Sequence, residues 1–282
     1  MISITGKTAL LGIFGDPVEQ TLSPRIQNAA LAAAGIDAVY LPFHILPEQL
    51  QSAVAAIRSL NLIGINVTVP HKETILPFLD EIDPAAALIG AVNTVVNRDG
   101  YLVGFNTDVT GFLASLRQNL QFDPQGKEVV VIGAGGACRA ALSALARHGA
   151  VRITIANRTQ QKAERLAEAI SLHYPATDFV ASALVESKLA AALATADLLV
   201  NTTSIGLTGD VFADFMIDRL PATAVVYDMV YAKETTPLIR SAQQRRLGSA
   251  DGRGMLVAQG EAAFVHWFGA APESGVMAAQ II

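Results

Sequence analysis

The chain has 282 residues and a formal net charge of −5; 51% of its residues are hydrophobic and only 16% are charged. With a mean hydropathy of +0.40, this composition is typical of a well-packed globular protein and excludes a disordered chain. The mild acidic excess gives no support for binding to nucleic acid or to an anionic membrane, since both need clustered basic residues. The length suggests one large domain or two ordinary ones.

Cys138 is the only cysteine, so the chain cannot form an internal disulfide and an oxidising compartment is not indicated. The apolar run at residues 9–15 is too short for a signal peptide and is followed by Asp16 and Pro17. No segment approaches the roughly 18 uninterrupted apolar residues of a membrane helix. We therefore expect a cytoplasmic protein.

The first 109 residues alternate predicted strands and helices. The hydrophobic patterns predict strands over residues 8–14, 39–45 and 63–69, and helices over residues 24–34 and 47–60. Each helix opens with a proline, which suits the first helical turn. Two further alternating runs flank Asp99 and Gly100, a dipeptide that predicts a two-residue hairpin turn.

A second series of alternating helix and strand patterns begins near Thr110 with a predicted helix over residues 111–120. Predicted strands follow near residues 128–132, 151–156, 197–201 and 224–230, and the helical patterns between them are typical of parallel βαβ units. Residues 254–268 have a helical pattern, and a further short apolar helix is predicted at the end of the chain. The fold class is therefore α/β with two domains, divided near residue 110.

A glycine-rich turn lies between a predicted strand and a predicted helix. Gly133, Gly135 and Gly136 have the spacing that lets a backbone approach a pyrophosphate at a helix N-terminus. Cys138 stands where the usual dinucleotide-binding pattern has a glycine or alanine. We interpret Cys138 as a packing residue, the alternative being a redox-active thiol.

The next predicted strand ends at Asn157, Arg158 and Thr159, with Lys162 nearby. NAD-binding folds carry an acidic residue about 20 positions after the glycine turn, where it accepts the ribose hydroxyls. A guanidinium at this place suits a 2′-phosphate instead, so NADP is favoured over NAD. The alternative is that Asn157 and Thr159 only cap the following helix, with Arg158 solvated.

If the second domain binds a nicotinamide cofactor, the first domain holds the substrate. Lys72 ends the stretch INVTVPHK and Asp108 ends GFNTD, both just beyond predicted strands. Hydride transfer to a carbonyl creates an alkoxide that needs a proton, which a lysine beside a carboxylate can donate. In INVTVPHK we expect both valines in the core, Asn66 and Thr68 facing the site, and Pro70 ending the strand. The alternatives are a solvated lysine and a helix-capping aspartate.

Eight motifs, in this order, make the chain similar to the shikimate dehydrogenases over nearly its whole length. The resemblance implies an NADP-dependent oxidoreductase that interconverts 3-dehydroshikimate and shikimate in chorismate and aromatic amino acid biosynthesis. It also implies a substrate domain over residues 1–109, a Rossmann-like NADP domain over residues 110–253, and a return of residues 254–282 to the first domain. The motifs are INVTVPHK, GAVNT, GFNTD, VIGAGGACRA, ANRT, NTTSIGL, YDMVY with TPL, and GMLVAQGEAAF.

The resemblance also implies the site residues. Lys72 would be the catalytic acid and base, and Asp108 its partner. The residues implied to hydrogen-bond the substrate are Thr21, Ser23, Thr68, Asn93, Tyr231 and Gln259. Those implied to hold the cofactor are Gly133, Ala134, Gly135, Gly136, Ala137, Asn157, Arg158, Thr159, Lys162, Met229 and Gly252, the last two near the nicotinamide.

One motif departs from the family pattern. The family typically has His-Ser-x-Ser-Pro near the N-terminus, whereas this chain has Gln20, Thr21, Leu22, Ser23 and Pro24. Thr21 keeps the hydroxyl that binds the substrate carboxylate in this family, but it adds a methyl group. Quinate carries an extra hydroxyl beside its carboxylate, so the methyl group puts the acceptance of quinate in question. The alternative is that the serine only caps the helix; both roles are compatible at a helix N-terminus.

Two other functions remain open from the sequence. One is a quinate/shikimate dehydrogenase of broader specificity, and the other is a non-catalytic NADP-binding regulatory protein. The expected partners are a small-molecule substrate and a second copy in a homodimer, without nucleic acid, membrane or metal. His71, His266 and Trp267 are predicted to have packing roles and no catalytic role.

Overall fold

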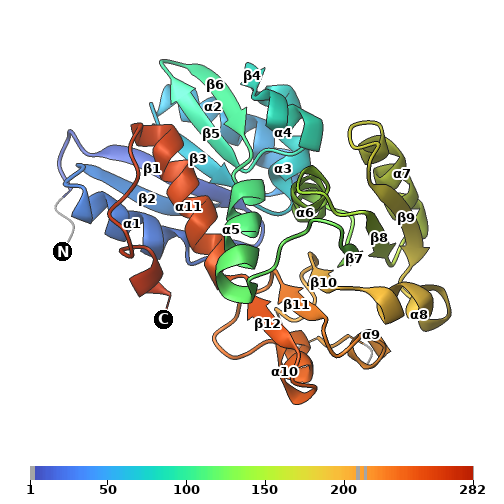
Figure 1. The fold of residues 1–282 in the computed structure, drawn as a ribbon. Coiled ribbons are helices and arrows are strands. Elements are labelled where there is room, and N and C mark those ends of the chain that lie inside the picture. The colour runs from blue at the N-terminus through green and yellow to red at the C-terminus, as the bar shows by residue number, and fades with distance from the viewer. Residues whose placement is uncertain (1–3, 208–209, 213–214, 282) are drawn as a thin grey trace. The chain divides into compact units, whose positions relative to one another are not determined.

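The computed structural model describes residues 4–207, 210–212 and 215–281, and it confirms the expected α/β fold class (Figure 1). The chain forms two compact units, each built around a six-stranded sheet. The first unit comprises the chain up to Gly111 together with the segment from Leu256 onwards, and the second is Phe112–Met255. The last long helix therefore returns to the first unit.

The first sheet is mixed and has the strand order β2-β1-β3-β5-β6-β4. Strands β1, β2 and β3 are parallel, whereas β5 is antiparallel to both of its neighbours, β3 and β6. The carboxyl ends of β1, β2, β3 and β6 and the start of β5 therefore meet at one edge. The strands are β1 (Ala9–Gly15), β2 (Ala38–His44), β3 (Gly64–Val67), β4 (Glu81–Ile82), β5 (Thr94–Arg98) and β6 (Tyr101–Phe105).

Helices cover both faces of the first sheet. On one face, the Trp267 indole of α11 donates to the Val95 carbonyl at 3.0 Å, and Gln27 of α1 donates to the Gly260 carbonyl of α11 at 3.0 Å. On the other face, α2 packs its apolar side against β3. The helices are α1 (Ser23–Ala33), η1 (Pro47–Gln49), α2 (Leu50–Ser59), α3 (His71–Thr74), η2 (Leu76–Phe78), α4 (Pro84–Ile89), α11 (Arg253–Phe268) and η3 (Ala278–Gln280).

The hairpin prediction is confirmed, because Asp99 and Gly100 both have positive φ angles (52° and 90°), as a type I′ turn requires. Two predictions for INVTVPHK are wrong: Val69 does not lie in the core, and the strand ends at Val67 and not at Pro70. Val67 is buried, but Val69 is 63% exposed. Strand β3 ends at Val67, and the His71 N–H then closes a turn on the Thr68 carbonyl at 2.9 Å, which directs Val69 to solvent.

The second sheet is entirely parallel and has the order β12-β11-β10-β7-β8-β9. The predicted βαβ units are therefore confirmed. The strand order reverses between β7 and β10, and ligands of such sheets bind beyond the carboxyl ends of the strands at this point. The strands are β7 (Glu128–Ile132), β8 (Arg152–Asn157), β9 (Asp178–Ala183), β10 (Leu198–Asn201), β11 (Val225–Asp228) and β12 (Gly248–Asp251).

Helices also cover both faces of the second sheet. Apolar side chains of α8, α9 and α10 form one core cluster with β7, β10 and β11. On the opposite face, Phe112 of α5 meets the Tyr227 ring edge-on, with centroids 5.2 Å apart. Among the described residues, no helix has the length and apolarity to cross a membrane. The helices are α5 (Asp108–Leu120), α6 (Gly136–Arg147), α7 (Gln160–Ser171), α8 (Glu186–Thr195), α9 (Phe215–Asp218) and α10 (Pro237–Gln244).

Candidate active site

The two residues predicted to react lie on neighbouring connections at one edge of the first sheet. Lys72 is in α3, shortly after β3, and Asp108 is the first residue of α5, shortly after β6. Strands β3 and β6 run in the same direction, so both connections leave the sheet at the same edge. The Val92 N–H donates to the Lys72 carbonyl at 2.8 Å and fixes the backbone of α3 there.

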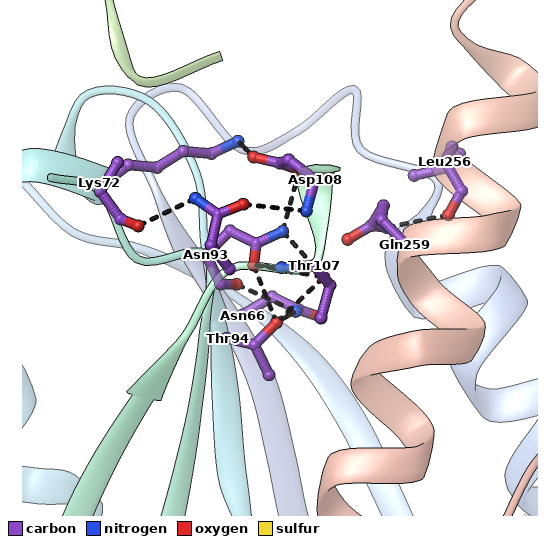
Figure 2. A network of polar contacts seen from close by, with 10 residues as sticks. Asn66, Lys72, Asn93, Thr94, Thr107, Asp108, Leu256 and Gln259 are labelled. Atoms are coloured by element: carbon purple, nitrogen blue, oxygen red, sulfur yellow. Dashed lines mark hydrogen bonds and ion pairs between the residues drawn. The ribbon is translucent and has the colours of Figure 1, made fainter. Parts of the chain in front are cut away.

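Lys72 and Asp108 form a largely buried ion pair (Figure 2). The Lys72 Nζ atom lies 2.6 Å from Asp108 Oδ2, and the two side chains are 15% and 5% exposed. Exposed ion pairs contribute little to stability, but a buried charge that loses its partner stays desolvated and uncompensated. The alternative of a solvated lysine therefore does not describe this structure.

Asn93 holds the other oxygen of the carboxylate. Its Nδ2 atom donates to Asp108 Oδ1 at 2.9 Å and to Thr107 Oγ1 at 3.0 Å. Its Oδ1 atom accepts from the Thr107 N–H at 2.8 Å and from Thr94 Oγ1 at 3.1 Å. Both amide protons and both acceptor positions are thus used within the protein. A hydrogen bond from Asn93 to a substrate would replace one of these contacts.

A further layer of buried polar side chains supports Asn93. Asn66 Nδ2 donates to the Asn93 carbonyl and to Thr94 Oγ1, both at 3.1 Å, and Asn66 Oδ1 accepts from the Tyr40 hydroxyl at 2.7 Å. Asn66 is 4% exposed, so it braces the site from within, whereas we had expected it to face the site. The roles of Tyr40, Thr94 and Thr107 in this network were not predicted from the sequence. For Tyr40 and Thr94 the available signal was a polar side chain inside an apolar strand, since buried polar groups need partners. Thr107 lies between β6 and α5 and carries no such signal.

The other predicted substrate residues of the first unit lie at or just before the start of α1, on α11 and just after β3. The Thr21 hydroxyl donates to Ser23 Oγ at 3.2 Å and accepts from the Ser23 N–H at 3.2 Å. Helix α1 begins at Ser23 and its N-cap residue, Leu22, forms no side-chain cap, so the serine does not act as the cap. Gln259 projects from α11 towards the Asn93 network, with Nε2 donating to the Leu256 carbonyl at 2.8 Å (Figure 2). Thr68 is half-buried.

The histidines near the site have packing roles, as expected. His71 is fully buried, with Nε2 2.6 Å from the Ile45 carbonyl oxygen. His266 stacks on Phe105 with ring centroids 4.1 Å apart. Partial burial lowers the pKa of His266, and Arg98 lowers it further while Asp83 opposes the shift. Among the described residues, neither imidazole forms an ion pair with Asp108.

The glycine turn of the second unit lies at the point where the strand order reverses. Gly133 follows β7 with a φ of +119°, and a Cβ atom there would overlap the Thr202 hydroxyl, which follows β10. Gly135 is the N-cap of α6 and is exposed, so the free N–H groups of this helix can receive a pyrophosphate. The turn therefore fits a dinucleotide. Cys138 is fully buried and fills the packing role expected for it.

The residues after β8 present unpaired positive charge. Asn157 Nδ2 donates to the Thr159 carbonyl at 2.9 Å and shapes the connection to α7. Thr159 is the N-cap residue of α7, but its side chain forms no cap hydrogen bond. Arg158 and Lys162 are exposed and form no ion pair with any described residue. Free cations at this position suit a phosphate group supplied by a ligand.

A buried polar cluster also lies at the carboxyl ends of β10 and β11, and its role was not predicted from the sequence. Asp228 accepts from Asn201 Nδ2 at 2.8 Å, from the Val230 N–H at 3.1 Å and from the Thr236 hydroxyl at 2.6 Å. Burial raises the pKa of Asp228, and the three hydrogen bonds partly offset that rise. The nearby Tyr227 also has a raised pKa because it is buried.

The predicted nicotinamide residues lie together next to this cluster. The Gly252 N–H donates to the Val230 carbonyl at 3.3 Å, and a Cβ atom at Gly252 would overlap the Met229 carbonyl. Only glycine therefore allows this approach of β12 to the segment after β11. Tyr231 follows on the same segment and is half-buried.

Comparisons with known proteins agree with this arrangement. Residues 13–95 match the family described as "Shikimate dehydrogenase substrate binding domain", and residues 115–230 match "Shikimate / quinate 5-dehydrogenase". The chain is 48% identical over 281 residues to the shikimate dehydrogenase (NADP(+)) of Geobacter metallireducens, covering 100% of this chain and 98% of that protein. The chain belongs to the shikimate dehydrogenase family. It is therefore an NADP-dependent oxidoreductase.

Solved shikimate dehydrogenase structures share the fold over almost the whole chain. A shikimate dehydrogenase in complex with NADP+ superposes with a TM-score of 0.89 at 36% identity, covering 99% of this chain and 96% of that one. The Thermus thermophilus enzyme, in complex with NADP(H) and shikimate, gives a TM-score of 0.84 at 33% identity, covering 97% and 98%.

Proposed function

We propose that this shikimate dehydrogenase family member catalyses the reversible NADP-dependent reduction of 3-dehydroshikimate to shikimate, a step towards chorismate and the aromatic amino acids. The observation that carries the proposal is the buried Lys72–Asp108 ion pair at 2.6 Å, oriented by Asn93. Bound NADPH supplies a hydride to the C3 carbonyl carbon. The residues of the chain then need to orient the substrate and to supply one proton.

Lys72 is the proposed proton donor. Hydride addition leaves a negative charge on the carbonyl oxygen, and the Lys72 ammonium neutralises it by transferring a proton. In the oxidation direction the neutral amine takes the hydroxyl proton back. Asp108 accepts from the ammonium through Oδ2 and is held at Oδ1 by Asn93, so the position of Nζ is set before the substrate arrives.

Hydroxyl and amide side chains are proposed to orient the substrate. Thr21 and Ser23 lie at the start of α1, where their hydroxyl groups and the helix dipole favour the substrate carboxylate. Thr68, Tyr231 and Gln259 are proposed to hydrogen-bond the remaining polar groups of shikimate. Asn93 is proposed to do the same by exchanging its contact with Thr107 while it keeps the one with Asp108. The direction of Gln259 towards the Asn93 network supports its assignment (Figure 2).

The second unit is proposed to bind NADP through the turn and the free cations described above. The Gly133 turn and the N-terminus of α6 suit the pyrophosphate, and Met229 and Gly252 are proposed to lie near the nicotinamide. The segment proposed for the pyrophosphate is Gly133, Ala134, Gly135, Gly136 and Ala137, and that for the adenosine phosphate is Asn157, Arg158, Thr159 and Lys162.

A quinate/shikimate dehydrogenase of broader specificity is the second candidate, because the matching family description names both substrates. The methyl group of Thr21, beside the proposed carboxylate site, opposes the extra hydroxyl of quinate. A non-catalytic NADP-binding regulatory protein is the third candidate, and the intact pair of Lys72 and Asp108 argues against it.

The test is a matrix of shikimate and quinate against NADP and NAD, followed by the absorbance of the reduced nicotinamide. We expect shikimate with NADP to give the highest kcat/KM. Binding of NADP without turnover of either substrate would overturn the enzyme mechanism. Equal turnover of quinate would replace it with the broader specificity, and a preference for NAD would remove the role of Arg158.

We also propose a cytoplasmic location and a homodimer. The single, buried cysteine is compatible with a reducing compartment. The edge strand β2 leaves Leu41 39% exposed, which supports a contact with a second copy. Sedimentation analysis across a range of concentrations tests the dimer, and a mass of one chain throughout would contradict it.

A further inference from the structure

Asp228, at the end of β11, is a fully buried carboxylate whose partners are all neutral. The Thr236 hydroxyl donates to Oδ2 at 2.6 Å, while the Val230 N–H and Asn201 Nδ2 donate to Oδ1 at 3.1 and 2.8 Å. None of the described lysines, arginines or histidines forms an ion pair with it. Burying a carboxylate without a cation costs free energy, so the burial of Asp228 at this place requires an explanation.

The hydrogen bonds to Asp228 fasten both ends of one segment. Val230 and Thr236 lie at the two ends of the connection between β11 and α10, and both donate to the same carboxylate. In the middle of this connection, Arg253 Nη2 donates to the Ala232 carbonyl at 2.6 Å. The segment 229–236 is therefore held at three points by the side chains of Asp228, the last residue of β11, and Arg253, which follows β12.

Asn201 extends the same network to the connection after β10. Its Nδ2 atom also donates to the Ile205 carbonyl at 3.0 Å, and its Oδ1 atom accepts from the Thr203 N–H and hydroxyl at 2.9 and 2.8 Å. Gly206 packs against Asp228 with a φ of +102°, and its Cβ position is 3.8 Å from Oδ2. Asp228 thereby joins two connections at the edge of the sheet where the glycine turn also lies.

We propose that Asp228 is a positioning residue, which holds the segment 229–236 in the conformation that hydride transfer requires. The segment carries Met229 and Tyr231, so this inference rests on the proposed contacts of those two side chains with the nicotinamide and the substrate. A segment fixed in advance loses less conformational entropy when the ligands bind. A carboxylate suits this task because its two oxygens accept several donors from different elements.

Thr236→Val is the sharpest test, because it is nearly isosteric and removes only the hydroxyl that reaches Oδ2. The same hydroxyl accepts from the Ile239 N–H at 3.4 Å at the start of α10, so stability is measured alongside activity. Thr236→Ser restores the hydroxyl. Thr177→Val is the matched control, since the Thr177 hydroxyl is also buried in this unit and donates to the Ala150 carbonyl at 2.8 Å. Asp228→Ala is the stronger, secondary variant.

The measurements are kcat and KM for NADPH and 3-dehydroshikimate, the melting temperature, and the affinity for 2′-phospho-ADP-ribose, which lacks the nicotinamide. For Thr236→Val we expect kcat/KM to fall by about tenfold, as for loss of a hydrogen bond to a charged group, with affinity for the probe within about twofold of the wild type. Thr236→Ser should recover kcat/KM. Thr177→Val should lower the melting temperature by about as much as Thr236→Val does, but it should leave kcat/KM unchanged.

Two outcomes overturn the inference. One is a folded Thr236→Val protein with unchanged kcat/KM, and the other is a parallel loss of probe affinity, which indicates general damage to the unit. If Asp228→Ala does not fold, Thr236→Val decides alone. The wild type in the same assay separates the two proposals: no wild-type turnover overturns the proposed function, whereas normal wild-type turnover with an unaffected Thr236→Val overturns only this inference.

Discussion

The two units of the chain treat their functional cations in opposite ways. In the first unit, Lys72 is largely buried and lies 2.6 Å from Asp108, whose other oxygen is held by Asn93. In the second unit, Arg158 and Lys162 are exposed and have no acidic partner among the described residues. Lys72 thus has its counter-charge within the protein, whereas Arg158 and Lys162 have none among the described residues.

The difference follows from what each cation is proposed to do. A group that transfers a proton has to stand in a defined position before the substrate arrives, so its partner belongs to the protein. A group that binds a phosphate gains its counter-charge from the ligand, so a protein carboxylate beside it would compete. The proposed proton donor is therefore held in position by the protein, whereas the proposed phosphate-binding cations have no partner until the ligand binds. Three predictions test this comparison, and a fourth concerns the pH dependence of stability in the first unit.

The largest expected effect is on turnover in Lys72→Ala. Loss of the proton donor should lower kcat by about 10²- to 10⁴-fold, the usual contribution of general acid–base catalysis, without unfolding the chain. Steady-state kinetics and circular dichroism provide the measurements. Lys127→Ala is the matched control, since Lys127 pairs with Asp197 at 3.0 Å in the second unit and has no proposed role. A Lys72→Ala protein that keeps most of its activity would contradict the proposed mechanism.

Asp108→Asn is expected to have the next largest effect. The amide keeps an oxygen for Asn93 but turns an N–H group towards the Lys72 ammonium, so the lysine loses its acceptor. We expect kcat to fall by about 10- to 100-fold, since orientation of the donor is only part of general acid catalysis. The KM for NADPH should not change. Asp197→Asn is the control, and an equal rise in the KM for NADPH would show that the defect is not local.

Arg158→Ala tests the proposed role of the exposed cations of the second unit in binding the phosphate of NADP. Loss of a charge-assisted hydrogen bond to a phosphate should raise the KM for NADP by about tenfold or more, with kcat and the KM for NAD nearly unchanged. Added salt should raise the wild-type KM for NADP in the same direction, because exposed charges are screened. Arg152→Ala is the control, since Arg152 is exposed at the start of β8, the strand that precedes Arg158, but is paired with Asp178. An unchanged preference for NADP would contradict the assignment.

The smallest expected effect concerns His266, which stacks on Phe105 in the first unit. Its pKa in the folded state is lowered from 6.5, so the unfolded chain binds more protons just below that pH. The stabilising contribution is therefore present above pH 6.5 and is lost as the pH falls through the lowered value. His266→Asn should reduce this loss in urea titrations, and exposed His173→Asn should not. Identical pH profiles for all three proteins would contradict the prediction.

Much of the fold and part of the candidate site follow from local sequence signals. The hairpin turn needed positive φ angles that Asp99 and Gly100 readily adopt. The parallel strands followed from the alternation of strand and helix patterns. Edge strands β4, β9 and β12 and the short helices α3, α4 and α9 were not predicted, because short, partly polar segments carry weak periodicity. Val69 followed the strand pattern but lies in a turn.

The sequence by itself determined the fold class, the glycine turn and the position of Lys72 and Asp108 just after strands, because each depends on residues close together in the chain. Only the tertiary structure decided that Asn93 is fully occupied by Thr94, Thr107 and Asp108, and that Asp228 binds Asn201 and Thr236. These hydrogen bonds depend on strand order and register. Local periodicity does not specify either, because many pairings bury the same apolar residues.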